Sequence, residues 1–274
     1  MTATYPLTTA LSIAASDSSG GAGIQADLKT FASLGVYGLT AICAVTAQNT
    51  LAVRAMESLS PSLVTAQLEA LWADIPPKAI KIGLLGPAAV ARAVKDFLAQ
   101  NAKDIPIILD PVMVSASGHV FLAPEDLAGL KELFPLATLI TPNLPEAEAL
   151  TGLLINCREL LLEAGKTLLA SGPAQVLIKG GHGEGPTCDD HFFDQTGITT
   201  FSGPRIKTNN THGTGCTLSS AIAAFLARGV SLKEAVKAAK DYVARAFLTA
   251  PPLGQGPGPL NHFHQYYSWE SQPK

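Results

Sequence analysis

The stretch ALSIAASDSSGGAGIQADLKTFASL, residues 10–34, contains the unit from which the fold follows. Residues 10–15 are mostly apolar and predict a strand, a turn rich in serine and glycine comes next, and residues 22–34 predict a helix. The same alternation of strand and helix continues along the chain. It predicts an α/β fold with a mostly parallel central sheet and helices on both faces.

Further strands and helices are expected at short intervals. Strands are predicted at residues 38–45, 79–84, 105–109, 139–140 and 176–179, and a hairpin at residues 188–194 and 198–202. Helices are predicted at residues 61–73, 88–100, 124–133, 215–228 and 232–248. No stretch has the composition of a linker, so residues 1–274 are expected to form one domain.

The composition argues against several classes of protein. The 274 residues are 47% hydrophobic and 15% charged, which is typical of an ordered globular protein. The net charge is −3 without a basic run, so no nucleic-acid partner is expected, and no apolar stretch approaches the ~20 residues of a membrane span. Residues 1–9 lack Lys and Arg, which argues against a secretory signal.

The cysteine pattern favours a reducing compartment. The chain has four scattered cysteines without a C-x-x-C pair: Cys43, Cys157, Cys188 and Cys216. This spacing argues against a zinc site and against a disulfide framework. A cytoplasmic location is therefore expected.

A second glycine-containing turn, THGTGCT at residues 211–217, begins the predicted helix at residues 215–228. Gly213, Thr214 and Gly215 are expected to expose backbone N–H groups where the helix dipole favours an anion. The same field is expected to lower the pKa of Cys216 and favour its thiolate. An anion site beside a candidate base suggests phosphoryl transfer to a small acceptor. The alternative is a glycine turn that caps a buried helix, with Cys216 as a small core residue.

The first glycine turn also matches the dinucleotide-binding pattern, because residues 21–26, GAGIQA, have the form G-x-G-x-x-A between a strand and a helix. That pattern also requires an acidic residue about 20 positions further on to bind a ribose, and residues 43–48, CAVTAQ, contain none. The glycines are therefore interpreted as a close approach of the backbone to a small ligand, with Asp17 and Asp27 as nearby polar groups.

Ligands of a parallel α/β sheet bind beyond the carboxyl ends of its strands. The loops expected at that edge are residues 16–23, 46–50, 83–86, 110–118, 141–146 and 180–185 and the turn at residue 211. Small and polar residues are concentrated in these loops. We therefore expect the functional site at this edge.

Eight segments along the chain occur in an order that resembles one family. They are SDSSGGAGIQADLK (16–29), VTAQNT (45–50), KIGLL (81–85), LDPVM (109–113), TPNLPEAE (141–148), LIKGGH (177–182), NTHGTGCTLS (210–219) and NHFH (261–264). Together they resemble the hydroxymethylpyrimidine/phosphomethylpyrimidine kinases of thiamine biosynthesis, in the ribokinase superfamily. The resemblance covers almost the whole chain.

The resemblance implies a ribokinase-like fold and an ATP-dependent kinase. The implied acceptor is 4-amino-5-hydroxymethyl-2-methylpyrimidine, which such enzymes convert to the monophosphate and then to the diphosphate. It also implies Mg²⁺, a homodimer and, from the superfamily, a monovalent cation. Cysteine at position 216, where the sugar kinases of the superfamily carry aspartate, points away from ribose or adenosine as the acceptor.

The resemblance also assigns residues of a substrate pocket. Gln48 matches the substrate-binding glutamine, whose amide can pair with the donor and acceptor edge of an aminopyrimidine. The first loop contributes Asp27, Gly21, Ala22 and Gly23. The wall of the pocket is assigned to Ala15, Thr46, Leu84 and Val112.

The catalytic and nucleotide-binding residues follow from the same resemblance. Asn143 and Glu146 match an N-x-x-E motif that positions Mg²⁺, with Asp110 assisting, although N-x-x-E taken alone is more often a helix cap. The residues assigned to ATP are Asn143, Lys179, Thr211, Gly213 and Gly215. The catalytic group is Cys216, Gly213, Thr214, Gly215 and Lys179.

Other interpretations remain open on the sequence alone. A pyridoxal kinase is the nearest, because vitamin B6 is also a small heteroaromatic ring with a hydroxymethyl group. A non-catalytic pyrimidine-binding protein on a decayed kinase fold and an NAD-dependent oxidoreductase are the others. Four histidines lack any metal-binding spacing and are interpreted as polar loop residues: His182, His212, His262 and His264.

Overall fold

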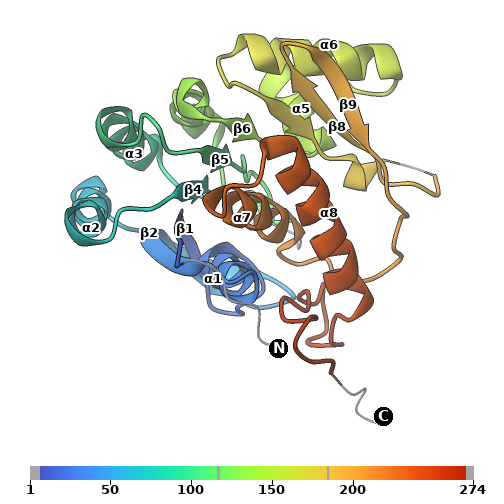
Figure 1. Ribbon diagram of the computed structural model, residues 1–274, viewed down its shortest axis with the longest axis horizontal. Coiled ribbons are helices and arrows are strands. Elements are labelled where there is room, and N and C mark those ends of the chain that lie inside the picture. The colour runs from blue at the N-terminus through green and yellow to red at the C-terminus, as the bar shows by residue number, and fades with distance from the viewer. Residues whose placement is uncertain (1–6, 116–117, 184, 270–274) are drawn as a thin grey trace.

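The computed structural model describes residues 7–115, 118–183 and 185–269. Within them the chain forms one nine-stranded sheet with the strand order β3-β2-β1-β4-β5-β6-β7-β8-β9 (Figure 1). The strands are β1 (Thr9–Asp17), β2 (Tyr37–Gln48), β3 (Val53–Ser58), β4 (Ala79–Ile82), β5 (Ile107–Leu109), β6 (Leu139–Ile140), β7 (Val176–Ile178), β8 (Asp190–Asp194) and β9 (Gly197–Phe201). Neighbours from β2 to β7 pair in parallel, whereas β3, β8 and β9 pair antiparallel at the two edges. The predicted mostly parallel α/β fold is confirmed.

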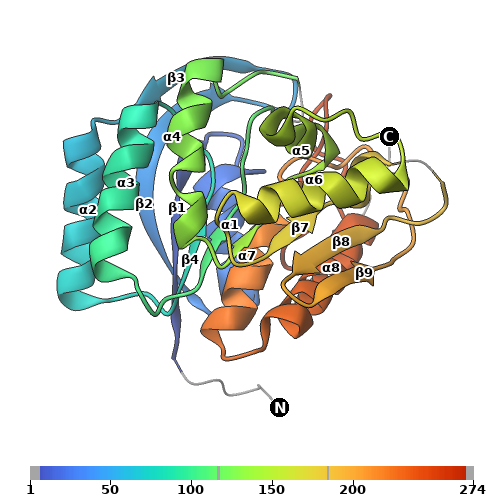
Figure 2. The same cartoon turned by 90° about the horizontal axis from the view of Figure 1, so that it is seen from above.

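Helices cover both faces of the sheet (Figure 2). They are α1 (Gly23–Ser33), α2 (Pro61–Asp74), α3 (Ala88–Asn101), α4 (Leu127–Lys131), α5 (Leu144–Thr151), α6 (Arg158–Ala170), α7 (Thr214–Ala227) and α8 (Leu232–Leu248), with 3₁₀ turns at Pro124–Asp126, Phe134–Leu136 and Gly180–His182. On one face α1, α7 and α8 pack together, and α2 to α6 lie on the other. Among the described residues, no helix combines the length and the apolar character that a membrane crossing requires.

The alternation of side chains along each strand builds the two halves of the core. Leu139 faces the core beneath α7 and α8, while the next residue, Ile140, faces the core on the opposite side. Because both faces are covered, the short parallel strands β5, β6 and β7 consist only of apolar residues rather than alternating with polar ones. This is why short apolar runs were sufficient to predict them.

The structure differs from the sequence prediction in several elements. β3, α5 and α6 were not predicted, and the predicted helix at residues 124–133 is a 3₁₀ turn followed by the short α4. The first residues of α5 fall in the stretch predicted as a loop at residues 141–146. β1 and β2 also extend to Asp17 and Gln48, which were expected in loops. β3 was missed because it is an edge strand with a mostly exposed surface, so it lacks the apolar signal of the buried strands.

Some sequence-based expectations fall on residues outside the described part of the chain. These are residues 1–6 of the segment considered for a signal, residues 116–117 of the loop at 110–118, and residue 184 of the loop at 180–185. The side chain of His182 is outside it as well.

Candidate active site

A cavity of about 750 Å³ lies at the carboxyl ends of the parallel strands. It brings together residues that are far apart in sequence, because the strand ends meet at one edge of the sheet. The predicted site residues that line it are Ala15, Ala22, Gly23, Thr46, Gln48, Leu84, Asp110, Val112, Asn143, Glu146, Lys179, Thr211, Gly213, Thr214, Gly215 and Cys216. Two residues assigned to the substrate pocket, Gly21 and Asp27, are not among the lining residues.

The turn before α7 opens into this cavity. Gly213 is the N-cap of α7 in the left-handed conformation, with φ of +79°, and no side chain caps the helix. A Cβ atom at Gly213 would collide with the backbone of Gly21 in the first turn, so the position requires glycine. The first residues of α7 line the cavity and no side chain caps them, although the Thr214 N–H makes a long bond of 3.3 Å to the Thr211 carbonyl. An uncapped helix start beside a cavity is the arrangement expected for an anion site.

A buried charge cluster lies opposite this turn. Lys179 follows β7, and its Nζ is 2.8 Å from Oδ1 of Asp110 and 3.9 Å from Oε2 of Glu146. A Cβ atom at Gly215 would lie 3.0 Å from Asp110 and 3.3 Å from the Lys179 ammonium. Burial works to lower the pKa of Lys179, but Asp110 and Glu146 outweigh it and raise that pKa. Lys179 is thus a stable cation at the start of α7.

Asn143 and Glu146 form the N-terminal cap of α5. The Asn143 side chain accepts the N–H of Glu146 at 2.9 Å, and Oε2 of Glu146 accepts the N–H of Asn143 at 2.7 Å. This reciprocal capping box is the alternative interpretation that the N-x-x-E motif allowed. Burial raises the pKa of Glu146 to about 7, with Lys179 opposing and Asp110 adding to the shift. The motif therefore caps the start of α5.

The oxygen donors at this end of the cavity fit an indirectly held Mg²⁺. No cluster of three or more His, Cys, Asp or Glu side chains able to hold a metal occurs among the described residues. Asp110 and Glu146 both line the cavity, but Oε2 of Glu146 is already engaged by the Asn143 N–H. Mg²⁺ keeps several waters and takes few carboxylates when phosphate oxygens complete its shell. The donor set is consistent with such a site.

The thiol of Cys216 differs from the prediction. Burial raises its pKa to about 11, although the nearby Lys81 ammonium opposes this shift. The expected lowering of the pKa by the helix N-terminus is therefore wrong, because the protein surroundings of the sulfur disfavour a thiolate more than the local positive field favours it. Cys216 is a neutral thiol at pH 7 in the unliganded cavity.

Lys81 and Asp27 form a fully buried ion pair beneath the cavity. Nζ of Lys81 is 2.8 Å from Oδ2 of Asp27, and the carboxylate also accepts the hydroxyls of Ser12 at 2.5 Å and Ser220 at 2.7 Å. Burial works to lower the pKa of Lys81, but Asp27, together with Cys216 and Asp110, outweighs it and raises that pKa. The Asp27 side chain, in α1, bonds to Ser12, Lys81 and Ser220 and is not among the residues that line the cavity.

Lys81 was missed in the sequence, although a signal existed. It is the one charged residue in AIKI, the four wholly buried residues of β4. A lysine in such a short apolar strand requires a buried partner. The sequence does not show that Asp27 is this partner, and the resemblance places Asp27 in the substrate pocket instead.

The first glycine turn is occupied by a side chain of the protein. The carboxylate of Asp17 accepts the N–H groups of Ser19 at 2.8 Å, Gly21 at 3.1 Å and Ala22 at 2.8 Å. Burial works to raise the pKa of Asp17, but these bonds, and above all the bond from His212, lower it to about 2. An ionised carboxylate thus takes the place that a pyrophosphate would have in a dinucleotide-binding turn. This argues against a dinucleotide at this turn.

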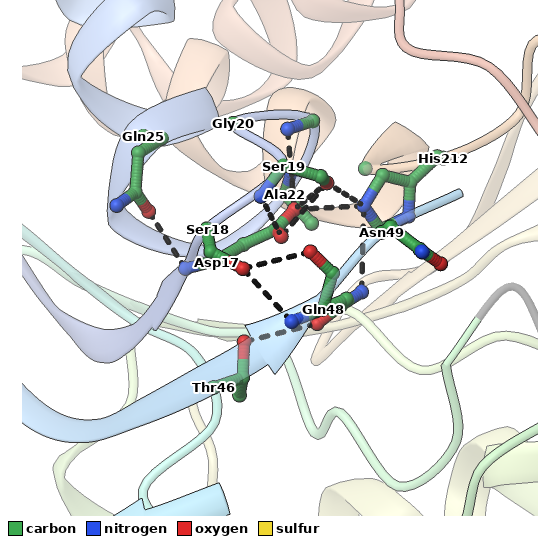
Figure 3. Close-up of polar contacts among 12 residues, drawn as sticks. Asp17, Ser18, Ser19, Gly20, Ala22, Gln25, Thr46, Gln48, Asn49 and His212 are labelled. Carbon is green, nitrogen blue, oxygen red and sulfur yellow. Dashed lines mark hydrogen bonds and ion pairs between the residues drawn. The ribbon is translucent and has the colours of Figure 1, made fainter. Parts of the chain in front are cut away.

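His212 joins the two turns. Its Nε2 is 2.8 Å from Oδ2 of Asp17, and its ring packs on Gly21, where a Cβ atom would collide with it (Figure 3). His212 and His262 lie in loops, as expected, but both are buried, which the sequence did not indicate. Nε2 of His262 is 3.0 Å from the Thr217 hydroxyl. No local pattern marks His212 as buried, because Asp17 is 195 residues away in the chain.

Comparisons with known proteins agree with this geometry. Residues 17–261 match the family described as phosphomethylpyrimidine kinase. A hydroxymethylpyrimidine/phosphomethylpyrimidine kinase from Rhizobium meliloti is 48% identical over 262 residues, which cover 94% of this chain and 98% of that protein. The crystal structure of a phosphomethylpyrimidine kinase from Clostridium difficile is 42% identical with a TM-score of 0.77, and the match covers 87% of this chain and 99% of that one.

A second group of solved structures is also similar. The pyridoxal kinase from Staphylococcus aureus, solved with AMP-PCP and pyridoxal, is 33% identical with a TM-score of 0.86 and 94% coverage of both chains. These neighbours share the ribokinase-like fold, so the predicted fold class and the predicted kinase are confirmed. The extent of the family match and the identity to its members show that this chain belongs to the phosphomethylpyrimidine kinase family.

Proposed function

We propose that this chain phosphorylates 4-amino-5-hydroxymethyl-2-methylpyrimidine to the monophosphate and then to the diphosphate, with ATP and Mg²⁺, for thiamine diphosphate biosynthesis. The observation that carries the proposal is the uncapped start of α7, which shares one cavity with Lys179 and the Gln48 amide. A phosphoryl donor and a small polar ring can thus be held on either side of Cys216. The match to the phosphomethylpyrimidine kinase family supports the choice of acceptor.

In this proposal the positive end of α7 stabilises the transferring phosphoryl group. The N–H groups at Gly213, Thr214 and Gly215 donate hydrogen bonds to its equatorial oxygens, and Lys179 neutralises charge at the same place. In a loose transition state positioning and charge neutralisation contribute most, and Cys216 as a base contributes less. ATP lies along Asn143, Lys179, Thr211, Gly213 and Gly215.

Mg²⁺, when bound with the nucleotide, neutralises charge on the phosphate oxygens. Asp110 and Glu146 are the residues we assign to holding it, Glu146 through water because its Oε2 caps α5. A monovalent cation, as in the superfamily, is also part of the proposal. Titration of the rate with Mg²⁺ and with K⁺ tests both assignments.

The acceptor pocket is assigned to Gln48 and to the residues around it. The amide of Gln48 pairs with the ring, and the close walls are Ala15, Ala22, Gly23, Thr46, Leu84 and Val112. We further propose that the chain is a single kinase domain that acts in the cytoplasm as a homodimer. The four cysteines are unpaired, which favours a reducing compartment, and light scattering tests the dimer.

Pyridoxal phosphorylation is the second candidate function, because the pyridoxal kinase structures align with a higher TM-score than the phosphomethylpyrimidine kinase structure does. Purified protein is to be incubated with ATP, Mg²⁺ and the pyrimidine alcohol, with pyridoxal in a parallel reaction. Formation of the monophosphate and then the diphosphate of the pyrimidine is expected. Turnover of pyridoxal alone would favour the second candidate, and turnover of neither would overturn both.

A further inference from the structure

Four side chains meet where the ends of β1 and β2 approach the turn before α7: Asp17, Thr46, Gln48 and His212 (Figure 3). Asp17, Thr46 and His212 are 3%, 4% and 5% exposed, whereas Gln48 is only partly buried and lines the cavity. The Ser18 hydroxyl fixes the backbone of Gln48, because it accepts the Gln48 N–H at 2.8 Å and donates to the Gln48 carbonyl at 2.7 Å. Only the orientation of the Gln48 amide is left to be set by its neighbours.

The contact with Asp17 shows which ring nitrogen of His212 carries a hydrogen. Nε2 is 2.8 Å from Oδ2 of Asp17, and the pKa of Asp17, lowered to about 2, keeps that group a carboxylate. A carboxylate only accepts hydrogen bonds, so Nε2 must carry a hydrogen. A protonated Nε2 has no lone pair, and therefore it cannot accept a hydrogen bond from the Gln48 amide.

The hydroxyl of Thr46 can only accept a hydrogen bond from Gln48, whereas Nε2 of His212 can only donate one. Its Oγ1 is 3.0 Å from the carbonyl oxygen of Ser16, which can only accept, so the single hydroxyl hydrogen is donated there. Oγ1 is also 3.3 Å from the amide of Gln48. Toward Gln48 the hydroxyl can therefore only accept.

These two constraints select one orientation of the amide. With Nε2 of Gln48 placed 3.5 Å from Nε2 of His212 and Oε1 beside Thr46, two N–H groups face each other at one end and no hydrogen joins the two oxygens at the other. Exchange of the amide oxygen and nitrogen, which have the same shape, removes both conflicts. The NH₂ group then donates to Oγ1 of Thr46, and the single hydrogen on Nε2 of His212, which is donated to Asp17, has the amide oxygen as a second and longer acceptor at 3.5 Å. The oxygen then lies beside His212 and the NH₂ group beside Thr46.

We propose that His212, held by Asp17, is a positioning residue that fixes the Gln48 amide with its oxygen toward the α7 turn and thereby selects 4-aminopyrimidines over 4-oxopyrimidines. This inference rests on the proposed function. Ring nitrogen N3, the 4-amino group and the 5-hydroxymethyl group occupy consecutive ring positions. If the 4-amino group donates to the oxygen beside His212 and N3 accepts from the NH₂ group, the hydroxymethyl group lies on the His212 side. His212 directly precedes Gly213, so this is the side of Cys216.

The decisive measurement is the ratio of kcat/KM for two acceptors. One is 4-amino-5-hydroxymethyl-2-methylpyrimidine, and the other is its 4-oxo analogue, which reverses the pattern by presenting an N3–H donor and an O4 acceptor. We expect the wild type to prefer the 4-amino compound ~100-fold. His212→Leu should reduce this preference at least ~10-fold, because the amide can then turn over to pair with either ring.

Two further variants separate positioning from a general structural role. His212→Gln keeps an N–H donor for Asp17 and should retain most of the preference. In a Gln48→Ala background, His212→Leu should leave the preference unchanged, because the residue acts through the amide. Equal losses for both acceptors in His212→Leu, or an unchanged preference, would overturn the proposal.

A measurement without substrate keeps the inference independent of the proposed function and of the folding of any variant. In the NMR spectrum of the wild-type protein, the Gln48 side-chain NH₂ should show a nuclear Overhauser effect to the Thr46 methyl group. Contact of that NH₂ with the His212 ring instead would contradict the assigned orientation even in an active pyrimidine kinase. The expected contact in a protein that phosphorylates no pyrimidine would overturn the proposed function and the selectivity, but not the orientation of the amide.

Discussion

The two glycine turns of this molecule resemble each other in sequence and differ in what occupies their N–H groups. The turn before α1 is closed by a carboxylate from within the chain, Asp17, which accepts three of its N–H groups. The turn before α7 has no side chain on the start of its helix and opens into the cavity. A glycine turn at a helix N-terminus can therefore hold an anion. Where a carboxylate of the protein already fills the turn, no ligand can bind there.

The closed turn supports the open one. His212, the residue before Gly213, bonds to Asp17, and the backbone of Gly21 lies against Gly213. Below them, Asp27 in α1 accepts the hydroxyl of Ser220 in α7, so the helices that follow the two turns are also joined. The comparison predicts that damage to this support affects stability, while damage to the open turn affects catalysis.

The largest effect is expected from breaking the shared support. Lys81→Met leaves the buried Asp27 carboxylate without its cation and should lower the free energy of unfolding by about 3–5 kcal/mol. Arg92→Met is the matched control, because it removes an exposed pair with Glu132 and should change the stability far less. Urea denaturation measures both, and similar losses in the two variants would contradict the role given to the buried pair.

The next effect sharpens the comparison at the open turn. Gly213→Ala adds a Cβ atom that collides with the first turn and should displace the α7 donors, which lowers kcat/KM by ~100-fold or more. Gly229→Ala has a similar positive φ of +82° but open space around it. This control should lose only about 1 kcal/mol of stability and keep its activity. Equal activity in the two variants would argue against an anion site at α7.

The Asp17 carboxylate in the closed turn should become protonated at low pH. Burial opposes ionisation of Asp17, but the His212 bond and the turn N–H groups lower its pKa from 3.8 to about 2. The stabilisation is therefore complete above about pH 4 and lost as the pH falls toward 2, and it amounts to about 2 kcal/mol. The wild type should lose that much more stability than Asp17→Asn over this interval. Parallel pH profiles of the free energy of unfolding would refute the assignment.

The smallest effect concerns Cys216 at the open turn. Burial raises the pKa of Cys216 to about 11, with Lys81 opposing, so the thiolate fraction increases as the pH rises from 8 to 10. If the thiolate acts as the base, the first phosphorylation should become faster over the same interval. The monophosphate is already an anion and needs no base. Cys216→Ala should therefore slow the first step ~10-fold more than the second and flatten its pH profile. Equal losses in the two steps would identify Cys216 as a packing residue.

The sequence predicted the central fold well because its strands are short, apolar and buried on both faces. The segments that it missed lack this signal. α5 starts at Leu144, directly after the N-cap Asn143 and with a proline in its first turn, so the stretch was interpreted as a loop. A helix cap followed by proline marks the start of a helix as well as it marks a turn.

The location of the candidate site was also predictable, whereas its internal contacts were not. The ends of parallel strands converge, so Gln48, Asp110 and Lys179 line one cavity as expected, although their roles stay predictions. The direction of Asp27 and the burial of His212 depend on partners in other elements, Lys81 and Asp17. The same limit applies to the pKa of Cys216, which depends on how much protein surrounds the sulfur.

The carboxylate in the first turn also separates the two turns in their response to the solvent. Because Asp17 is part of the chain, its local concentration does not change with the buffer, and free sulfate or phosphate cannot compete it away. No side chain caps the turn before α7, so we expect inorganic oxyanions in a purification or assay buffer to compete there with the nucleotide of the proposed function. On this expectation, one turn of the molecule responds to the anions of the buffer, whereas the neighbouring turn of similar sequence does not.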